Sequence, residues 1–257
     1  MNRRGSRFAG RLLKSNLSDE EYEAICHSLV MPNGVRKTTV ESRNTELLRR
    51  LWKSEQLPLA NPISVLDVGA GFGLDALSTW QFLSEHVDVE RYVLADNYTH
   101  LLYEPARQLV FDQDHNLLQV SRGSGFVSIH FSYNYAFQKI TYAGKRVLPA
   151  RLKRKYEFDP VAEIIRIPIV TPRIQLNGKS PFELRRMNVF ETVHGQFDLI
   201  VCMHLLVNRY FSPNQIQVGI RNLSASLAPK GILVVGALDN YQVISLLDGR
   251  GRASFRD

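Results

Sequence analysis

The stretch Ile63-Ser-Val-Leu-Asp-Val-Gly-Ala-Gly-Phe-Gly-Leu-Asp-Ala-Leu-Ser78 decides the fold of this chain. An apolar run of strand length, residues 63–68, ends at the alternating glycines Gly69, Gly71 and Gly73, and apolar residues at helical spacing follow. Glycines adopt positive φ and let a ligand approach the backbone, while the first N–H groups of the new helix are donors without helical partners. This order of strand, glycine turn and helix predicts an α/β fold with a site for a nucleotide-like ligand.

The spacing of the glycines separates this loop from the common phosphate-binding loops. A dinucleotide-binding turn has the pattern G-x-G-x-x-G and a phosphate loop needs G-K-[ST], whereas this chain has G-x-G-x-G without a lysine. Residues 65–73 instead resemble the first motif of the class I S-adenosylmethionine-dependent methyltransferases. The resemblance implies S-adenosylmethionine as cofactor and gives five cofactor-binding candidates: Asp67, Gly69, Ala70, Gly71 and Gly73. The alternative is a glycine-bounded buried strand in some other α/β protein.

The same resemblance implies a fold class and a division of the chain. We expect α/β architecture with a Rossmann-like, doubly wound and mostly parallel seven-stranded sheet, preceded by helices and carrying a β-rich insertion. Residues 1–60 would form an N-terminal helical cap region, and residues 61–257 the catalytic domain with the insertion at about 112–181. The N-terminal helices either contribute a lid over the cofactor or simply pack against the sheet edge.

Two helices are predicted before the first strand. Ser18 and Glu21 form a capping box that opens a helix over about 19–30, and the Pro-Asn-Gly sequence that follows ends it. A second helix, over about 39–54, places its leucines on one stripe.

Composition is that of an ordinary globular protein, with 257 residues, 44% hydrophobic and 22% charged. No apolar run reaches the roughly 18 residues that a membrane span needs, and no secretory segment is evident. We therefore expect a cytoplasmic protein without a membrane span. The two cysteines, Cys26 and Cys202, lie in unrelated patterns, which predicts buried residues rather than a disulfide framework or a metal site.

Basic residues account for the net charge of +7, and they gather in two runs, at 3–14 and 145–155. Such runs can follow the phosphates of nucleic acid or an anionic surface, although solvated faces are the commoner outcome. Nucleic acid is therefore an alternative partner.

A second strand is predicted over residues 91–95, with Asp96 at its end and a helix from about Tyr98 to Val110 after it. In class I methyltransferases an acid at this point accepts hydrogen bonds from both ribose hydroxyls, a role that suits two carboxylate oxygens. By this resemblance Asp96 is a further cofactor candidate and Asn97 flanks the adenosine. Asp96 also suits a helix N-cap, which is compatible with the first role.

The stretch 111–181 is far longer than a minimal version of the fold requires. Residues 126–137 and 164–170 alternate with period two, and Asn177-Gly178 is a strong hairpin-turn signal. Insertions on α/β scaffolds usually lie at the ligand face and set specificity. The insertion either selects the substrate or forms a homodimer, and the sequence favours neither.

A third strand over residues 182–187 leads to Asn188 and Val189. In the family this position often contacts the adenine, so both residues are cofactor candidates. The alternative for Asn188 is an ordinary turn asparagine.

A further buried strand is predicted over residues 197–202. Residues beyond its carboxyl end lie at the crevice where open α/β sheets bind ligands. We therefore expect Cys202, Met203 and His204 to face the transferred methyl group.

The region 188–231 is also similar, over about 50 residues, to the chemotaxis receptor glutamate methyltransferases. The similarity rests on Asn188-Val-Phe, Phe197-Asp-Leu-Ile-Val-Cys, Asn208-Arg-Tyr-Phe and Leu227-Ala-Pro-Lys-Gly. It fails at Met203-His204, where that family has Arg-Asn, and no acidic helical domain comes first. Receptor methylation is therefore not predicted. The last residues, 241–257, predict two short antiparallel edge strands.

The predicted activity is methyl transfer from S-adenosylmethionine to an oxygen, nitrogen or carboxylate of a small molecule. The reaction needs in-line positioning, whereas a general base is optional. His204 is the candidate base, with a packed or substrate-facing histidine as the alternative, and no metal-ligand spacing is present. A nucleic-acid or protein methyltransferase is an alternative, although the Asn/Asp-Pro-Pro-Tyr tetrad of flipped-base enzymes is missing. A non-catalytic S-adenosylmethionine-binding protein is another.

Overall fold

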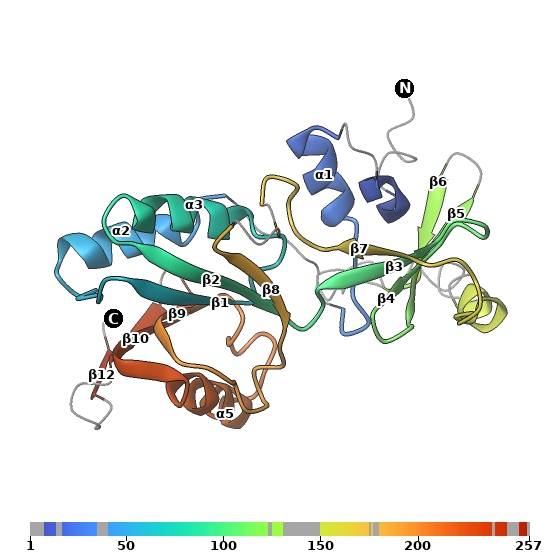
Figure 1. Cartoon of the computed structure of the whole chain (residues 1–257). Helices are drawn as coiled ribbons and strands as arrows, with labels where there is room; N and C mark the ends of the chain where they lie inside the picture. The colour runs from blue at the N-terminus through green and yellow to red at the C-terminus, as the bar shows by residue number, and fades with distance from the viewer. Residues whose placement is uncertain are drawn as a thin grey trace. The chain divides into compact units, whose positions relative to one another are not determined.

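The chain forms two compact units in a computed structural model (Figure 1). Unit 1 comprises residues 1–38 and 100–169, and unit 2 comprises residues 39–99 and 170–257. The structure describes the following residues: 8–13, 17–34, 41–122, 125–130, 150–174, 176, 180–237, 240–245 and 252–255.

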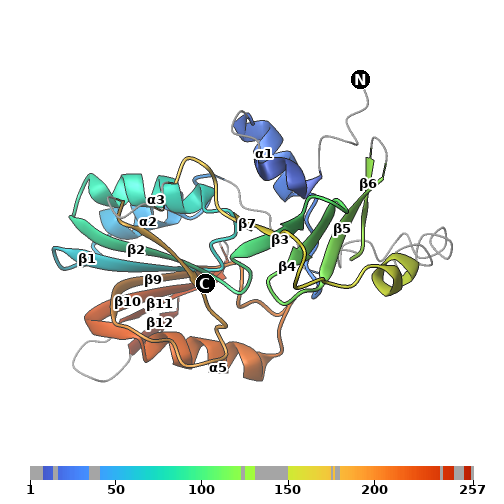
Figure 2. The ribbon, with the colours of Figure 1, turned by 45° about the vertical axis from the view of Figure 1, so that its right-hand side comes forward.

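Unit 2 is built on a seven-stranded sheet of order β12-β11-β10-β9-β1-β2-β8 (Figure 2). Its strands are β1 (Ile63–Val68), β2 (Val89–Asp96), β8 (Phe182–Arg186), β9 (Phe197–Met203), β10 (Leu227–Ala237), β11 (Asn240–Ser245) and β12 (Arg252–Phe255). The strands β8, β2, β1, β9 and β10 are parallel, and β11 and β12 continue the sheet antiparallel at one edge. The predicted α/β fold with a parallel sheet and antiparallel edge strands is confirmed. In open sheets of this kind ligands bind at the carboxyl ends of the strands.

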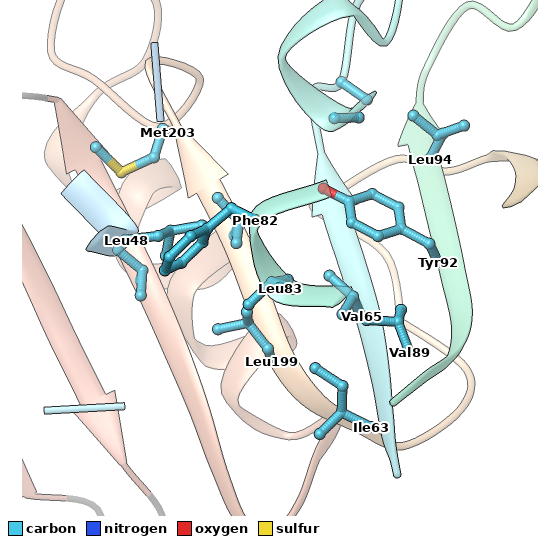
Figure 3. Close-up of a cluster of buried hydrophobic side chains, with 14 of the residues drawn as sticks. Leu48, Ile63, Val65, Phe82, Leu83, Val89, Tyr92, Leu94, Leu199 and Met203 are labelled. Atoms are coloured by element: carbon cyan, nitrogen blue, oxygen red, sulfur yellow. The ribbon is translucent and has the colours of Figure 1, made fainter. Parts of the chain in front are cut away.

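Helices cover both faces of this sheet. α2 (Thr45–Lys53) and α3 (Leu74–Ser84) lie over one face, and α5 (Pro213–Ser224) lies over the other. Because successive strand residues point to opposite faces, Val65 packs with Leu83 of α3, while Leu66 packs with Leu223 of α5. Figure 3 shows part of the α3 side of this core. Strands buried on both faces need an apolar residue at nearly every position, which explains why Ser64 and Asp67 are the only polar residues in β1.

Hydrogen bonds define the starts of two helices, and the first of them confirms the capping box predicted at Ser18. The Ser18 hydroxyl accepts from the Glu21 amide at 3.2 Å and opens α1 (Asp19–Cys26). The Ser212 hydroxyl accepts from the Gln215 amide at 3.4 Å at the start of α5, where a proline follows the cap. Both are capping boxes, in which the third helical residue returns a bond to the cap.

Unit 1 contains a five-stranded antiparallel sheet of order β6-β5-β4-β3-β7. Its elements are the 3-10 helix η2 (Ala9–Leu13), α1, β3 (His100–Glu104), β4 (Leu109–Asp112), β5 (Leu117–Arg122), β6 (Gly125–Ser128) and β7 (Ile165–Pro168). A helical segment at 150–155 contributes the buried Leu152 to the core that includes Leu109 and Phe111.

The predicted helix from Tyr98 to Val110 is wrong, because this stretch forms β3 and the start of β4. The two strands pair antiparallel, with Leu102 opposite Phe111. Pro105 lies between them, where it would remove a helical N–H, and Gln108 adopts a φ of 51° in the turn. Short apolar runs do not distinguish helix from strand by periodicity, so pairing with other strands, including that of β3 with residues 165–168, decided the outcome.

The β-rich part thus begins at residue 100 rather than about 112, and residues 8–34 belong to it. The buried side chain of Gln119 on β5 explains this grouping. It accepts from the Ala9 amide at 2.9 Å and donates to the Ser28 hydroxyl at 3.2 Å, which holds η2 and the end of α1 on the sheet. β6 and β7 confirm strand structure at 125–128 and 165–168, whereas residues 131–149 and the Asn177-Gly178 turn lie outside the described residues.

Candidate functional site

The glycine loop, residues 69–73, connects the carboxyl end of β1 to α3 in unit 2. Gly69, Gly71 and Gly73 have φ angles of 76°, 60° and 74°. These values lie in the left-handed region, which glycine occupies without steric cost. Gly73 is the N-cap residue of α3, and no side chain caps that helix. The first backbone N–H groups of α3 therefore begin directly after the loop.

Neighbouring side chains also restrict the loop to glycine. A Cβ at Gly73 would lie 2.8 Å from Cδ1 of Ile174 and 3.2 Å from Cδ2 of Leu94. A Cβ at Gly69 would lie 3.3 Å from the side chain of Leu205, which follows β9. The loop is thus enclosed at Gly73, whereas Gly69 remains exposed.

Hydrogen bonds join the carboxyl ends of neighbouring strands at the edge that carries the loop. The Gly69 amide donates to the Ala95 carbonyl of β2 at 2.8 Å, and the His204 amide after β9 donates to the Gly236 carbonyl of β10 at 2.6 Å. Residues that lie far apart in the sequence therefore meet at one edge.

Asp96 lies at this edge, at the end of β2, and is half-buried. One carboxylate oxygen accepts from the Gly71 amide at 3.3 Å, and the other accepts from the Tyr98 amide at 3.0 Å. The Asp96 carbonyl accepts from the Met187 amide at 3.0 Å, which ties the end of β8 to the same point. Asn97, the next predicted residue, is exposed. The structure thus brings the predicted acid to the predicted loop.

Asp67 is buried beneath the loop, on the face covered by α3. Its Oδ2 accepts from the Tyr92 hydroxyl at 3.2 Å. Burial, and secondarily the nearby Asp75 carboxylate, raise the pKa of Asp67 to about 8. At neutral pH this carboxyl therefore retains a proton in the protein alone.

Asp75, in the first turn of α3, was not predicted as a site residue. Its side chain is buried, and its Oδ1 accepts from the Asn44 amide at 2.9 Å. Burial raises the pKa of Asp75 to about 6, while the backbone N–H groups of residues 43–45 oppose that rise. An acid in the first turn of a helix is common, so its place in the sequence carried no functional signal.

Asn188 forms a turn of its own after β8. Its Oδ1 accepts from the Phe190 amide at 3.1 Å, and its Nδ2 donates to Glu191 at 2.8 Å. Val189 has a buried side chain, and its carbonyl accepts from Asn222 of α5 at 3.1 Å. These bonds favour the turn interpretation for the Asn188 side chain.

The side chains of Cys202, Met203 and His204 do not share one direction. Cys202 is fully buried in the core on the α5 face, and burial raises the pKa of its thiol to about 12. Met203 lies in the core on the opposite face, and half-buried His204 follows the strand with a φ of 62°. The expectation that all three face the methyl group is incompatible with the alternation along β9. Ala70 is likewise buried in the core.

A cavity of about 830 Å³ lies away from the glycine loop. It is lined by residues around the amino end of β2, among them Trp80, His86 and Asp88. The exposed glycine backbone and the Asp96 carboxylate lie at the opposite end of these strands. We place the candidate site at the carboxyl edge, because polar groups from several strands converge there.

Within the described part of the chain, no three histidine, cysteine, aspartate or glutamate side chains form a group that could hold a metal ion. Over the same residues, no helix has the length and apolar character that crossing a membrane requires.

The basic runs are only partly described, since residues 3–7, 14, 145 and 146 lie outside the described ranges. Arg11 forms an ion pair with Glu21 at 3.3 Å, and the ammonium of Lys155 lies 5.2 Å from the centre of the Tyr156 ring. These contacts support a solvated face.

The fold and site define an α/β protein whose parallel strands end beside a glycine loop and a carboxylate. No family model and no curated protein matches the sequence. Solved structures with similarity include the N-methyltransferase NodS from Bradyrhizobium japonicum WM9 in complex with S-adenosyl-L-homocysteine, at 14% identity and a TM-score of 0.34. That similarity covers 75% of this chain, which spans 58% of the NodS chain.

A second solved structure with similarity is S-adenosylmethionine-bound CalS10 from Micromonospora echinaspora, an amino pentose methyltransferase. Its identity is 14% and its TM-score 0.37, over 93% of this chain and 75% of CalS10. Both TM-scores are low, so we base the function on the site itself.

Proposed function

We propose that unit 2 binds S-adenosylmethionine at the glycine loop and that the protein transfers the methyl group to a small-molecule acceptor. The observation that carries this proposal is the 3.3 Å hydrogen bond between the Gly71 amide and the Asp96 carboxylate. The family resemblance assigns the loop to the methionine part of the cofactor and the acid to its ribose. These two predicted elements, separated in the sequence, are adjacent at the carboxyl edge of a parallel sheet.

The residues present fit this cofactor in polarity and charge. Asp96 offers two acceptor oxygens for vicinal hydroxyls, and the exposed backbone at Gly69 allows close approach. S-adenosylmethionine carries positive charge on its sulfonium and amino groups, and a positive charge beside the loop favours the ionised form of Asp67. The cofactor, when bound, supplies the methyl group and its own leaving group. The protein supplies position.

His204 is the residue that we propose for proton transfer, because it follows β9 at the carboxyl edge and is only half-buried. An amine or hydroxyl acceptor benefits from such a base. Once an acceptor is known, His204→Asn should lower kcat by about 10²-fold and leave cofactor affinity unchanged. An unchanged kcat would assign His204 to packing.

We place the choice of acceptor in unit 1. This five-stranded antiparallel sheet is what the chain adds to the α/β scaffold, and added elements usually set specificity.

Calorimetric titration with S-adenosylmethionine and S-adenosylhomocysteine tests the cofactor. Asp96→Ala should weaken binding by about 1–3 kcal/mol, the range for a hydrogen bond to a charged group. Asp198→Ala is the matched control, because the Asp198 carboxylate accepts from the Ser64 amide at 2.8 Å at the amino end of β1. A folded wild-type protein that binds neither nucleoside would overturn the proposal, as would equal losses in both variants.

A further inference from the structure

The buried Asp75 carboxylate connects the start of α3 with the chain segment at 41–45. The Asn44 amide donates to Asp75 Oδ1 at 2.9 Å. Asn44 is the N-cap residue of α2 but makes no cap bond with its own side chain. Asp75 therefore supplies, from another helix, the negative group that the N-terminus of α2 favours.

Two further contacts hold the same segment to α3. The Thr45 and Thr79 hydroxyls lie 3.2 Å apart, and the Ser42 hydroxyl donates to the Ser78 hydroxyl at 3.3 Å. Asp75 is the charged member of this set and the one nearest in sequence to the glycine loop.

The segment at 170–174 packs on the glycine loop itself. The Thr171 amide donates to the Phe72 carbonyl at 2.8 Å, and Ile174 occupies the space beside Gly73. Arg173 forms an ion pair with Glu41 at 3.2 Å, which links the 170–174 segment to the 41–45 segment. The loop and the first turn of α3 are thus contacted by two segments that are joined to each other.

Both segments adjoin points where the chain passes between the units, at 38/39 and 169/170. The third passage, at 99/100, follows Asp96 by a few residues. Every connection between the units therefore lies close in sequence to a residue that contacts the glycine loop or its helix.

We propose that Asp75 is a positioning residue that holds the 41–45 segment on α3 and thereby sets the glycine loop for cofactor binding. This inference rests on the proposed function. Asp75 acts through the backbone of the segment and of the loop.

The ionised form of Asp75 is the effective one, since a carboxylate accepts bonds from N–H groups more strongly than a carboxylic acid does. The charged or titratable groups that face it are Asp67 of β1, Tyr92 of β2 and Arg43 of the segment. The pKa of Asp75 is raised to about 6, so its anionic form is lost as the pH falls through that value. Cofactor affinity should fall over the same interval.

The test combines calorimetry with S-adenosylhomocysteine and hydrogen exchange of the peptide that contains residues 41–45. Asp75→Ala should weaken binding by about tenfold and speed exchange at Asn44. Asp75→Asn, which keeps the shape, should remove the fall in affinity near pH 6. Asp198→Ala and Asp198→Asn are matched controls, because that carboxylate also accepts a backbone amide of the same sheet.

Wild-type affinity in both Asp75 variants, or unchanged exchange at 41–45 in Asp75→Ala, would overturn the inference. If Asp75→Ala does not fold, the pH profile of Asp75→Asn decides the question. If the wild-type protein binds neither nucleoside, the proposed function fails. Exchange at 41–45 then still shows whether Asp75 holds the segment.

Discussion

The Tyr92 hydroxyl donates to Asp67 Oδ2 at 3.2 Å, in the core directly beneath the glycine loop. Both side chains are almost entirely buried, and each comes from a central parallel strand. An acid at the end of β1 therefore has a specific partner within the protein. The first two predictions concern this pair.

Removing the Tyr92 hydroxyl should destabilise unit 2. Tyr92→Phe leaves a buried carboxyl oxygen without its donor, which should lower the free energy of unfolding by about 1–3 kcal/mol. Tyr210→Phe, at a side chain that is 38% exposed, is the control and should change little. Chemical denaturation measures both, and equal stability of the two variants would show that the Tyr92 bond contributes nothing.

The raised pKa of Asp67 predicts how stability depends on pH. The folded protein keeps this proton up to about pH 8, whereas the unfolded chain releases it near pH 3.8. Because the folded state binds more protons, the contribution of Asp67 is lost as the pH rises through that interval. Between pH 6.5 and 8, the titration of Asp67 lowers the free energy of unfolding by at most about 1.4 kcal/mol per pH unit.

Asp67→Asn should flatten that slope, because the amide does not titrate. Denaturant unfolding at several pH values measures the effect, and Asp198→Asn controls for loss of a carboxylate elsewhere in the sheet. A wild-type stability that rises from pH 6.5 to 8, with the same rise in Asp67→Asn, would contradict the assigned protonation state.

Two glycines of the loop should respond differently to alanine. Both have positive φ, but the new methyl group would lie 2.8 Å from Ile174 at position 73 and 3.3 Å from Leu205 at position 69. We expect Gly73→Ala to cost about 2–4 kcal/mol of stability and Gly69→Ala about 1 kcal/mol. Thermal and denaturant unfolding distinguish the two, and the reverse order would show that backbone strain outweighs the contact.

Gln119 should determine whether residues 8–34 stay on the sheet of unit 1. Gln119→Ala removes the acceptor of the Ala9 amide and a donor to the Ser28 hydroxyl, which should cost about 1–3 kcal/mol. Limited proteolysis should then cut within residues 8–34 earlier than in the wild type. Gln81→Ala, at an exposed position of α3, is the control, and equal cutting rates in the two variants would refute the role of Gln119.

Sequence alone determined the features that depend on short-range pattern. The strand, glycine turn and helix at 63–84 follow from an apolar run, residues that tolerate positive φ, and helical spacing. The capping boxes at Ser18 and Ser212 follow from hydrogen bonds between residues three apart. The position of Asp96 at the end of a strand is of the same kind, because the strand pattern ends there.

Tertiary structure alone decided the features that depend on pairing between distant residues. The stretch 100–112 forms strands because β3 and β4 pair with each other and because β3 also pairs with β7, which lies much later in the chain. Cys202 and Met203, which point to opposite faces of β9, are both buried because the sheet is covered on both sides. Asp75 accepts the Asn44 amide because the 41–45 segment returns to the first turn of α3. Such contacts depend on the closure of long loops and on burial, which no local pattern of residues records.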